Sequence, residues 1–196
     1  MRVVAGELRG RRLSSVPGRE TRPTSDRARA GVFDWLRDRV SGARVLDLFA
    51  GTGALGVEAL SRGDREAVFL ERASPALRVL RGNLAALGLE SRARVVERDL
   101  SRGLGALVGD GGVFELVFAD PPYQGDWLQR LVSCETLGQI LGSGAVVIAE
   151  RSARSAPVIP HAGAAALVLR GSKRYGETAF DWYEVPGAVG RGESET

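Results

Sequence analysis

The chain has 196 residues, of which 44% are apolar and 26% charged, a composition typical of one globular domain. No apolar run approaches the ~20 residues of a membrane span, and the N-terminus lacks the apolar core of a signal peptide, so a cytoplasmic protein is expected. One cysteine and one histidine exclude an internal disulfide and zinc sites built from several such residues.

The formal net charge of +3 conceals a basic N-terminal part. Residues 1–44 hold eleven arginines against five acids, a balance of +6, so the remaining residues sum to −3. A cluster of arginines within about two dozen residues predicts contact with the phosphates of a nucleic acid, although a solvated surface would have the same composition. The cluster comprises Arg9, Arg11, Arg12, Arg19, Arg22, Arg27 and Arg29.

The predicted elements begin with a small hairpin or extended arm over residues 2–13. A helix follows from Ser25, which, like Thr24, can cap it, and apolar residues continue at helical spacing to Val40. Ser74 and Pro75 predict the start of a later helix, and Gly88 its end. Strands and helices alternate from residue 44 onward. The predicted strands are 44–49, 67–71, 93–97, 113–119 and 145–150, and the predicted helices are 54–61, 75–87, 100–107 and 127–141.

The end of the chain differs from this alternation. Segments 164–170 and 178–185 predict an antiparallel strand pair, and 187–196 a disordered tail. The whole pattern predicts an α/β fold, a doubly wound, mostly parallel, seven-stranded Rossmann-like sheet. We expect three parts: a basic hairpin or arm that contacts RNA (1–24), the sheet domain (25–186) and the tail.

A Gly-rich turn lies between the first strand and the next helix. Gly51-x-Gly53-x-x-Gly56 matches the dinucleotide fingerprint, and Glu71 follows Gly51 by twenty residues, the distance of a ribose-binding acid. Asp47, just before the turn, suits an ammonium group and is awkward beside a pyrophosphate. This acid favours S-adenosylmethionine over a nicotinamide dinucleotide.

Acids lie near the C-terminal ends of four successive predicted strands, at Asp47, Glu71, Asp99 and Asp120. Each has a simpler explanation, and Asp99 alone is better explained as the N-cap of the helix at Leu100. Their shared position at the edge where open α/β sheets bind ligands nevertheless predicts a site. There Asp99 could accept a hydrogen bond from an adenine amino group.

Asp120-Pro121-Pro122-Tyr123 follows the fourth predicted strand. Two prolines stiffen the backbone and expose carbonyl oxygens that can accept hydrogen bonds from an amino group. Asp120 offers a second acceptor, and the Tyr123 ring offers a face on which a planar base can stack. A Pro-Pro turn whose tyrosine covers the core explains the same residues.

These motifs resemble known families. Segments 47–56 and 120–123 are similar to those of class I S-adenosylmethionine-dependent N-methyltransferases. The run Arg-Pro-Thr-Ser-Asp-Arg-Ala-Arg at 22–29 resembles the bacterial 16S rRNA guanine-N2 methyltransferase family RsmD, and the likeness covers residues 2–185. Ser25 and Ala30-Gly31 depart from the family pattern, which has Thr and a Glu with a small or hydroxyl partner there.

The resemblance implies a methyltransferase sheet with S-adenosylmethionine along the strand ends. The backbone of the Gly-rich turn and Asp47 would lie near the methionine moiety, and Glu71 at the ribose. Asp99 and Leu100 would lie at the adenine. The site residues implied for the cofactor are Asp47, Gly51, Gly53, Glu71, Asp99 and Leu100.

The resemblance also implies a substrate and a mechanism. A flipped guanine would stack on Tyr123 while Asp120 and the Pro121 carbonyl accept its two amino hydrogens. The partner would be 16S rRNA, free or within an assembling small subunit, and we expect a monomer without a metal. The implied RNA contacts are Arg9, Arg11, Arg12, Arg22, Arg27, Arg29 and Arg174.

Other functions stay open on the residues alone. A protein-glutamine N-methyltransferase could use the same acceptor turn, and a DNA adenine methyltransferase would need a larger base-reading region. A non-catalytic RNA-binding domain would explain the charge but not the acids. Cys134, expected in the core in the middle of a helix, argues against carbon-5 pyrimidine methylation, which needs a catalytic cysteine.

Overall fold

A seven-stranded sheet of order β3-β2-β1-β4-β5-β7-β6 forms the centre of the molecule. The computed structural model describes residues 1–16, 25–109, 112–122, 125–160 and 167–187. The β1–β2, β2–β3, β1–β4 and β4–β5 pairs are parallel, and β7 pairs antiparallel with β5 and β6, which confirms the predicted fold class. The strands are β1 (Arg44–Leu48), β2 (Glu66–Glu71), β3 (Ala93–Glu97), β4 (Phe114–Ala119), β5 (Leu141–Ser152), β6 (Val168–Tyr175) and β7 (Thr178–Glu184).

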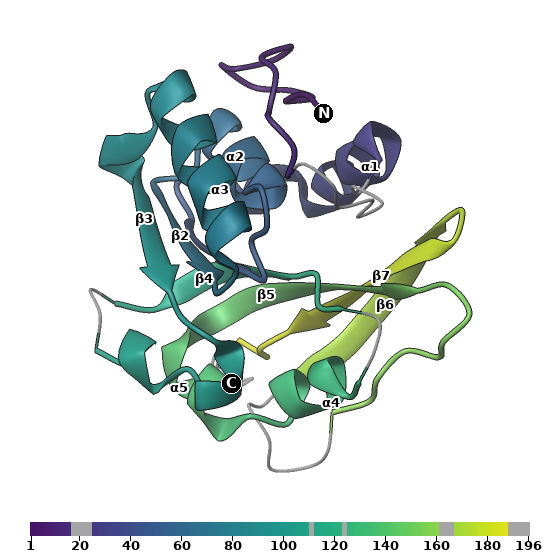
Figure 1. The fold of residues 1–196 in the computed structure, drawn as a ribbon. Coiled ribbons are helices and arrows are strands. Elements are labelled where there is room, and N and C mark those ends of the chain that lie inside the picture. Colours follow the sequence, from purple (N-terminus) through teal and green to yellow (C-terminus); the bar gives the residue numbers. More distant parts are fainter. Residues whose placement is uncertain (17–24, 110–111, 123–124, 161–166, 188–196) are drawn as a thin grey trace, which may run out of the picture.

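Helices cover both faces of the sheet. In Figure 1, α1, α2 and α3 lie on one side and α4 and α5 on the other. The residues of β1 alternate between two apolar cores, because Val45 packs with the first group of helices and Leu46 and Leu48 with the second. The helices are α1 (Asp26–Leu36), α2 (Ala54–Ser61), α3 (Ser74–Leu87), α4 (Trp127–Val132) and α5 (Glu135–Ile140).

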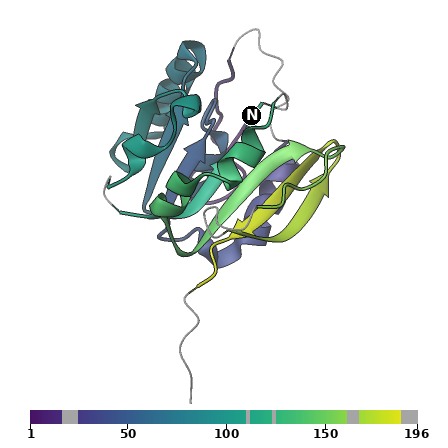
Figure 2. The same ribbon diagram turned by 90° about the horizontal axis from the view of Figure 1, so that it is seen from below.

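The start of α1 follows the prediction, because Ser25 Oγ accepts a hydrogen bond of 3.1 Å from Ala28 N. A β-carbon at Gly31 would lie 2.2 Å from Tyr175 Oη, so only glycine allows α1 to lie this close to the end of β6. Trp35 packs on Trp182, with ring centroids 4.8 Å apart. Helix α1 is therefore anchored on the antiparallel end of the sheet, whose long strands are seen in Figure 2.

The N-terminal hairpin is closed by an antiparallel bridge between Arg2 and Arg12 and lies against α2 (Figure 1). Its apolar residues Val3 and Leu13 are buried in the same core as α1–α3. The Glu58 carboxylate accepts hydrogen bonds from Val4 N (2.7 Å) and Ala5 N (2.9 Å). The hairpin is thus packed into the sheet domain.

Some predicted boundaries were wrong. The segment 127–141 is not one helix, because α4 and α5 are separated at Cys134. The backbone of Cys134 is extended (φ −84°, ψ 114°) and this residue is the N-cap of α5. The cysteine is half-buried and does not lie in the middle of a helix. Periodicity missed the break because the two helices bury the same face, through Leu131 and Leu137. The predicted helix 100–107 is two short 3₁₀ turns, Leu100–Arg102 and Gly105–Leu107.

The N-cap of α3 is Ala73 and not Ser74, whereas Gly88 ends this helix in the left-handed conformation as predicted. Strand β5 begins at Leu141, directly after α5. The described helices include none with the length and apolar character that crossing a membrane requires. His161, most of the tail and the start of the segment 164–170 lie outside the described residues.

Candidate active site

The sheet brings the predicted acids to one edge. Asp47 is aligned with Phe69 of β2 and Phe118 of β4, while Glu71 ends β2 and Asp120 directly follows β4. Asp99 follows β3, the next strand along. Because the parallel strands β3, β2, β1 and β4 are adjacent, their carboxyl ends gather these acids in one row.

The Gly-rich turn is bonded to two of these acids. Gly51 N donates to Glu71 Oε2 (2.8 Å), and Gly56 N, in the first turn of α2, donates to Asp47 Oδ2 (2.9 Å). Gly53 has a φ of 81°, a conformation that favours glycine, and caps α2. A β-carbon at Gly56 would lie 2.3 Å from the Phe69 ring, so this glycine permits close packing of helix on strand.

Glu71 joins the turn to the start of α3. Its Oε1 accepts hydrogen bonds from Arg72 N (2.8 Å) and Ala73 N (2.7 Å), while its Oε2 holds Gly51 N. A carboxylate has about four acceptor positions, so Glu71 has one left for a hydroxyl of a ribose. The side chain is thereby held in place before any ligand binds.

Asp47 is buried, at 2% exposure, and burial raises its pKa to about 8. The Gly56 N–H partly opposes this shift, and the nearby charge of Glu71 adds to it. A group that is uncharged when the site is empty and ionises beside a cation is suited to receive an ammonium group.

Asp99 has partners on the protein in this structure. Its carboxylate accepts from Ser101 N (2.9 Å) and pairs with Arg72 Nη1 (2.8 Å), and these contacts lower its pKa to about 2. Asp99 therefore caps the turn that begins at Leu100, the simpler of the two roles predicted for it. An ionised, outward-lying carboxylate next to the Leu100 backbone can also accept from an adenine amino group.

The acceptor turn lies beside a cavity of about 150 Å³. Burial, together with the charges of Glu150 and Asp47, raises the pKa of Asp120 well above its ordinary value. Pro121 is buried and lines the cavity with Pro122. Tyr123 lies outside the described residues. The described part of this turn provides a desolvated carboxyl group, at Asp120, next to two prolines that line the cavity.

Two aromatic residues missed by sequence reasoning also belong to this region. Phe49, at the end of β1, has a φ of 59°, which is rare for a bulky residue, and its ring lies edge-on to Trp127 at 5.6 Å. Trp127, the first residue of α4, lines the cavity. The aromatic pair links the cofactor-side turn to the cavity wall. Backbone strain of this kind has no sequence signal.

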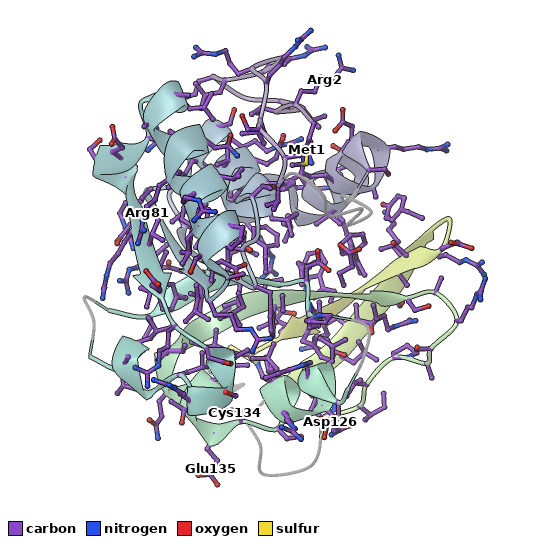
Figure 3. All side chains as sticks on the ribbon, viewed as in Figure 1. Met1, Arg2, Arg81, Asp126, Cys134 and Glu135 are labelled. Atoms are coloured by element: carbon purple, nitrogen blue, oxygen red, sulfur yellow. The ribbon has the colours of Figure 1, made fainter. Side chains whose placement is uncertain are left out.

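The predicted RNA contacts fall into separate groups. Arg9, Arg11 and Arg12 are exposed on the hairpin, and Arg27 is exposed on α1. Arg174 is exposed at the end of β6, where its Nε donates to the Gly176 carbonyl (2.7 Å). Figure 3 shows the hairpin residue Arg2 near α1, at the opposite end of the view from Asp126 near α4. Arg22 lies outside the described residues.

The prediction for Arg29 was wrong. Its side chain is 0% exposed and lies between Asp26 Oδ1 (2.9 Å from Nη2) and Glu58 Oε2 (3.4 Å from Nε). Its Nη2 also donates to the Arg2 carbonyl. A buried guanidinium cannot reach a phosphate, so Arg29 fixes α1 and the hairpin onto α2. Charge counting cannot separate buried from exposed arginines.

Glu150 is a further buried acid, at 3% exposure, and it lines the same cavity. It lies near the C-terminal end of β5, beside Asp120, because Ala119 and Ala149 are aligned in the β4–β5 pair. The signal was present in the sequence, since Glu150 is the last residue of a predicted strand, as Glu71 is.

Comparisons with known proteins agree with this geometry. A family model described as "Conserved hypothetical protein 95" matches residues 1–184. The chain is 32% identical to ribosomal RNA small subunit methyltransferase D of Escherichia coli K12 over 185 residues, covering 94% of this chain and 89% of that protein. It is 34% identical to the Haemophilus influenzae protein of the same name over 137 residues, or 69% of this chain and 71% of that protein.

A solved structure is similar over nearly the whole chain. The yhhF protein of Escherichia coli superposes with a TM-score of 0.79 at 32% identity, covering 96% of this chain and 99% of that one.

Proposed function

Because the chain belongs to the conserved hypothetical protein 95 family, the RsmD family, we propose that it transfers a methyl group from S-adenosylmethionine to the exocyclic N2 amine of a guanine in 16S ribosomal RNA. The observation that carries the proposal is the position of Asp120 and Pro121. They follow the carboxyl end of β4, next to β1 and its Gly-rich turn, and Pro121 lines a cavity. A 16S rRNA substrate would place the reaction in the cytoplasm.

The cofactor would lie along the ends of β1, β2 and β3. Its ammonium group would be near Asp47, its ribose at Glu71 and its adenine at Asp99 and Leu100. The sulfonium supplies an electrophilic methyl group and a positive charge. That charge offsets the desolvated carboxyl groups of Asp47 and Asp120, whose raised pKa values reflect burial.

The base would enter the cavity as a flipped nucleotide. The lone pair of an exocyclic amine is delocalised into the ring, so the amine is a poor nucleophile. When Asp120 and the Pro121 carbonyl accept its two hydrogens, the nitrogen becomes pyramidal and its lone pair points at the methyl group. S-adenosylmethionine held at the strand ends would supply the methyl group to this nitrogen, and the proton that the methylated amine gives up would pass to Asp120 or to water. Catalysis is mainly orientation and electrostatic stabilisation.

The test compares Asp120→Asn with Asp120→Ala in single-turnover methylation of small-subunit rRNA at saturating cofactor, which isolates transfer from product release. Asn keeps a carbonyl oxygen and should retain measurable activity, whereas Ala should lose at least ~10²-fold, as expected for one oriented polar group. Both variants should still bind S-adenosylmethionine. Wild-type transfer by Asp120→Ala, or methylation of a nucleotide other than guanine, would contradict the proposal.

A further inference from the structure

Three carboxyl groups lie on one face of the sheet, near the carboxyl ends of the adjacent strands β1, β4 and β5. They belong to Asp47, Asp120 and Glu150. Each of them comes two positions after a residue of the core under α1–α3, so alternation along the strands places all three side chains on that face. These core residues are Val45, Phe118 and Ile148. Asp120 is in the middle of the row, because β4 pairs with both β1 and β5.

The neighbouring acids act on Asp120 through their charge. Burial, and then Glu150 and Asp47, raise the pKa of Asp120 well above its ordinary value of 3.8. The pKa of Asp47 is itself raised to about 8, by burial and by Glu71 of β2, against the effect of the Gly56 N–H of α2. The charges that act on these two aspartates within the described part of the chain are those of other carboxylates. The row therefore keeps protons until a cation enters it.

The proposed cofactor has two cationic groups, and only one of them survives the reaction. The ammonium group is present before and after methyl transfer, whereas the sulfonium charge is lost with the methyl group. The methyl carbon must come within ~3.5 Å of an amine that is hydrogen-bonded to Asp120 at ~2.9 Å, so the sulfonium charge would lie within ~8 Å of this carboxyl group. At an effective dielectric constant of about 20, a unit charge at that distance favours the ionised carboxylate by roughly 30-fold.

We propose that Asp120 senses the charge of the cofactor. It is ionised and accepts a hydrogen bond from the guanine amine when S-adenosylmethionine is bound, and it is protonated when the product S-adenosylhomocysteine is bound. This inference rests on the proposed function, because the amine and the methyl donor must meet at Asp120.

The change of state follows the methyl transfer. Asp120 takes the proton that the guanine nitrogen gives up on gaining the methyl group, while the electron pair of the carbon–sulfur bond stays on sulfur, which becomes neutral. A protonated carboxyl group is a weaker acceptor than a carboxylate, so the methylated base is held less tightly. When a fresh cofactor replaces the spent one, Asp120 returns its proton to water.

Proton counting by calorimetry tests the proposal in the wild-type protein. The binding enthalpy is measured in phosphate and in Tris, over a range of pH, for S-adenosylmethionine and for S-adenosylhomocysteine. S-adenosylmethionine should release more protons, by about 0.7 at the pH of the largest difference if Asp120 binds its proton 30-fold more weakly. An analogue in which a carbon bearing an amino group replaces the methylated sulfur is also cationic and should behave like S-adenosylmethionine.

Asp120→Asn identifies the group that titrates. An amide does not ionise, so the difference between the two ligands should largely disappear while both still bind. Asp47→Asn is the matched control: because both ligands carry the ammonium group, this change should lower the proton release for each and leave most of the difference. Glu150→Gln should move the pH of the largest difference downward, because a negative charge that raises the pKa of Asp120 is removed.

The outcomes are distinguishable. If the wild type released equal numbers of protons with both ligands at every pH, the charge-sensing role of Asp120 would be overturned while the proposed function stood. A difference that persisted in Asp120→Asn would assign the proton to another group and would also overturn it. If neither ligand bound, the proposed function itself would fail, and this inference with it.

Discussion

The side-chain amide of Asn83 donates a hydrogen bond of 3.0 Å to the main-chain carbonyl of Thr52, which ties α3 to the Gly-rich turn. The same side chain accepts from Ser14 N (2.8 Å) and donates to the Ser14 carbonyl (3.2 Å). Asn83 is 3% exposed. One buried amide therefore holds both the end of the N-terminal hairpin and the turn that would contact the cofactor.

Replacing Asn83 by Ala should weaken both attachments. Backbone groups of the exposed Ser14 and the half-buried Thr52 would lose their three hydrogen bonds to Asn83, and each such bond contributes about 0.5–1.5 kcal/mol. We expect the free energy of unfolding to fall by about 2–3 kcal/mol and S-adenosylmethionine to bind about 10-fold more weakly. Denaturant titration and calorimetry measure these effects, with Gln139→Ala on the exposed side of α5 as control. If Asn83→Ala bound S-adenosylmethionine as tightly as the wild type, the hydrogen bond from Asn83 to Thr52 would not contribute to cofactor binding.

The two glycines of the turn should respond differently to substitution by Ala. A β-carbon at Gly51 meets only the Phe49 carbonyl, at 3.8 Å, so it would project into open space where the ligand is expected. At Gly53 it would lie 2.4 Å from Leu80 Cδ1. Gly51→Ala should therefore weaken cofactor binding with little loss of melting temperature, whereas Gly53→Ala should destabilise the fold.

Gly42→Ala is the matched control for these variants, because Gly42 also has a positive φ and open space around it but lies away from the turn. It should show the cost of the left-handed backbone alone, about 1 kcal/mol. Tight cofactor binding by Gly51→Ala would show that the ligand does not approach this backbone.

Cofactor binding should release a proton at pH 7. The raised pKa of Asp47, about 8, keeps it mostly protonated in the empty site, and a bound ammonium group favours the ionised form. The calorimetric enthalpy should therefore depend on the ionisation enthalpy of the buffer. Asp47→Asn should reduce the number of protons released. Identical enthalpies in phosphate and Tris for the wild type would exclude this coupling.

The same group should make the unliganded protein less stable as the pH rises. The pKa of Asp47 is higher in the folded state than its ordinary value of 3.8, so the folded state binds the proton more tightly. Its contribution to stability is complete below about pH 4 and is lost as the pH rises toward 8. Denaturation at several pH values should give a smaller decline for Asp47→Asn than for wild type.

The exposed arginines of the hairpin and α1 should govern the salt dependence of RNA binding. Changing Arg9, Arg12 and Arg27 to Gln should reduce the slope of log K against log salt by about 0.7–0.9 for each lost phosphate contact. Arg81→Gln, an exposed change on α3 (Figure 3), serves as control. If the slope equalled that of the wild type, these arginines would not contact the phosphates of RNA.

Arg29→Gln should behave in the opposite way. It would remove the buried ion pair with Glu58 but leave that carboxylate with Arg62 (2.9 Å) and two backbone N–H groups, so the loss should be smaller than the about 3–5 kcal/mol expected when the remaining buried charge has no partner. We expect a loss of stability without a specific change in the salt slope of the remaining folded protein. If Arg29→Gln were as stable as the wild type and had a smaller salt slope for RNA binding, Arg29 would contact RNA.

The sequence allowed the sheet and the row of acids to be predicted, because buried parallel strands are apolar and their ends carry the polar residues. It did not allow the break at Cys134 to be predicted, since apolar spacing is the same for one helix and for two that share a face. Arg29 and Asn83 are long-range partners, and their burial depends on contacts made only after the chain folds. Phe49 has a positive φ and packs against Trp127, and no local pattern encodes either feature.

The docking of the hairpin has a consequence for how the chain folds as it is synthesised. Val4 and Ala5 bond to Glu58, and Ser14 bonds to Asn83, at sequence separations of 54, 53 and 69 residues. The hairpin leaves the ribosome before α2 and α3 and must therefore wait for these helices before it can be buried. Until then Val3 and Leu13 stay accessible to chaperones, and a pause in translation before α3 would prolong that interval.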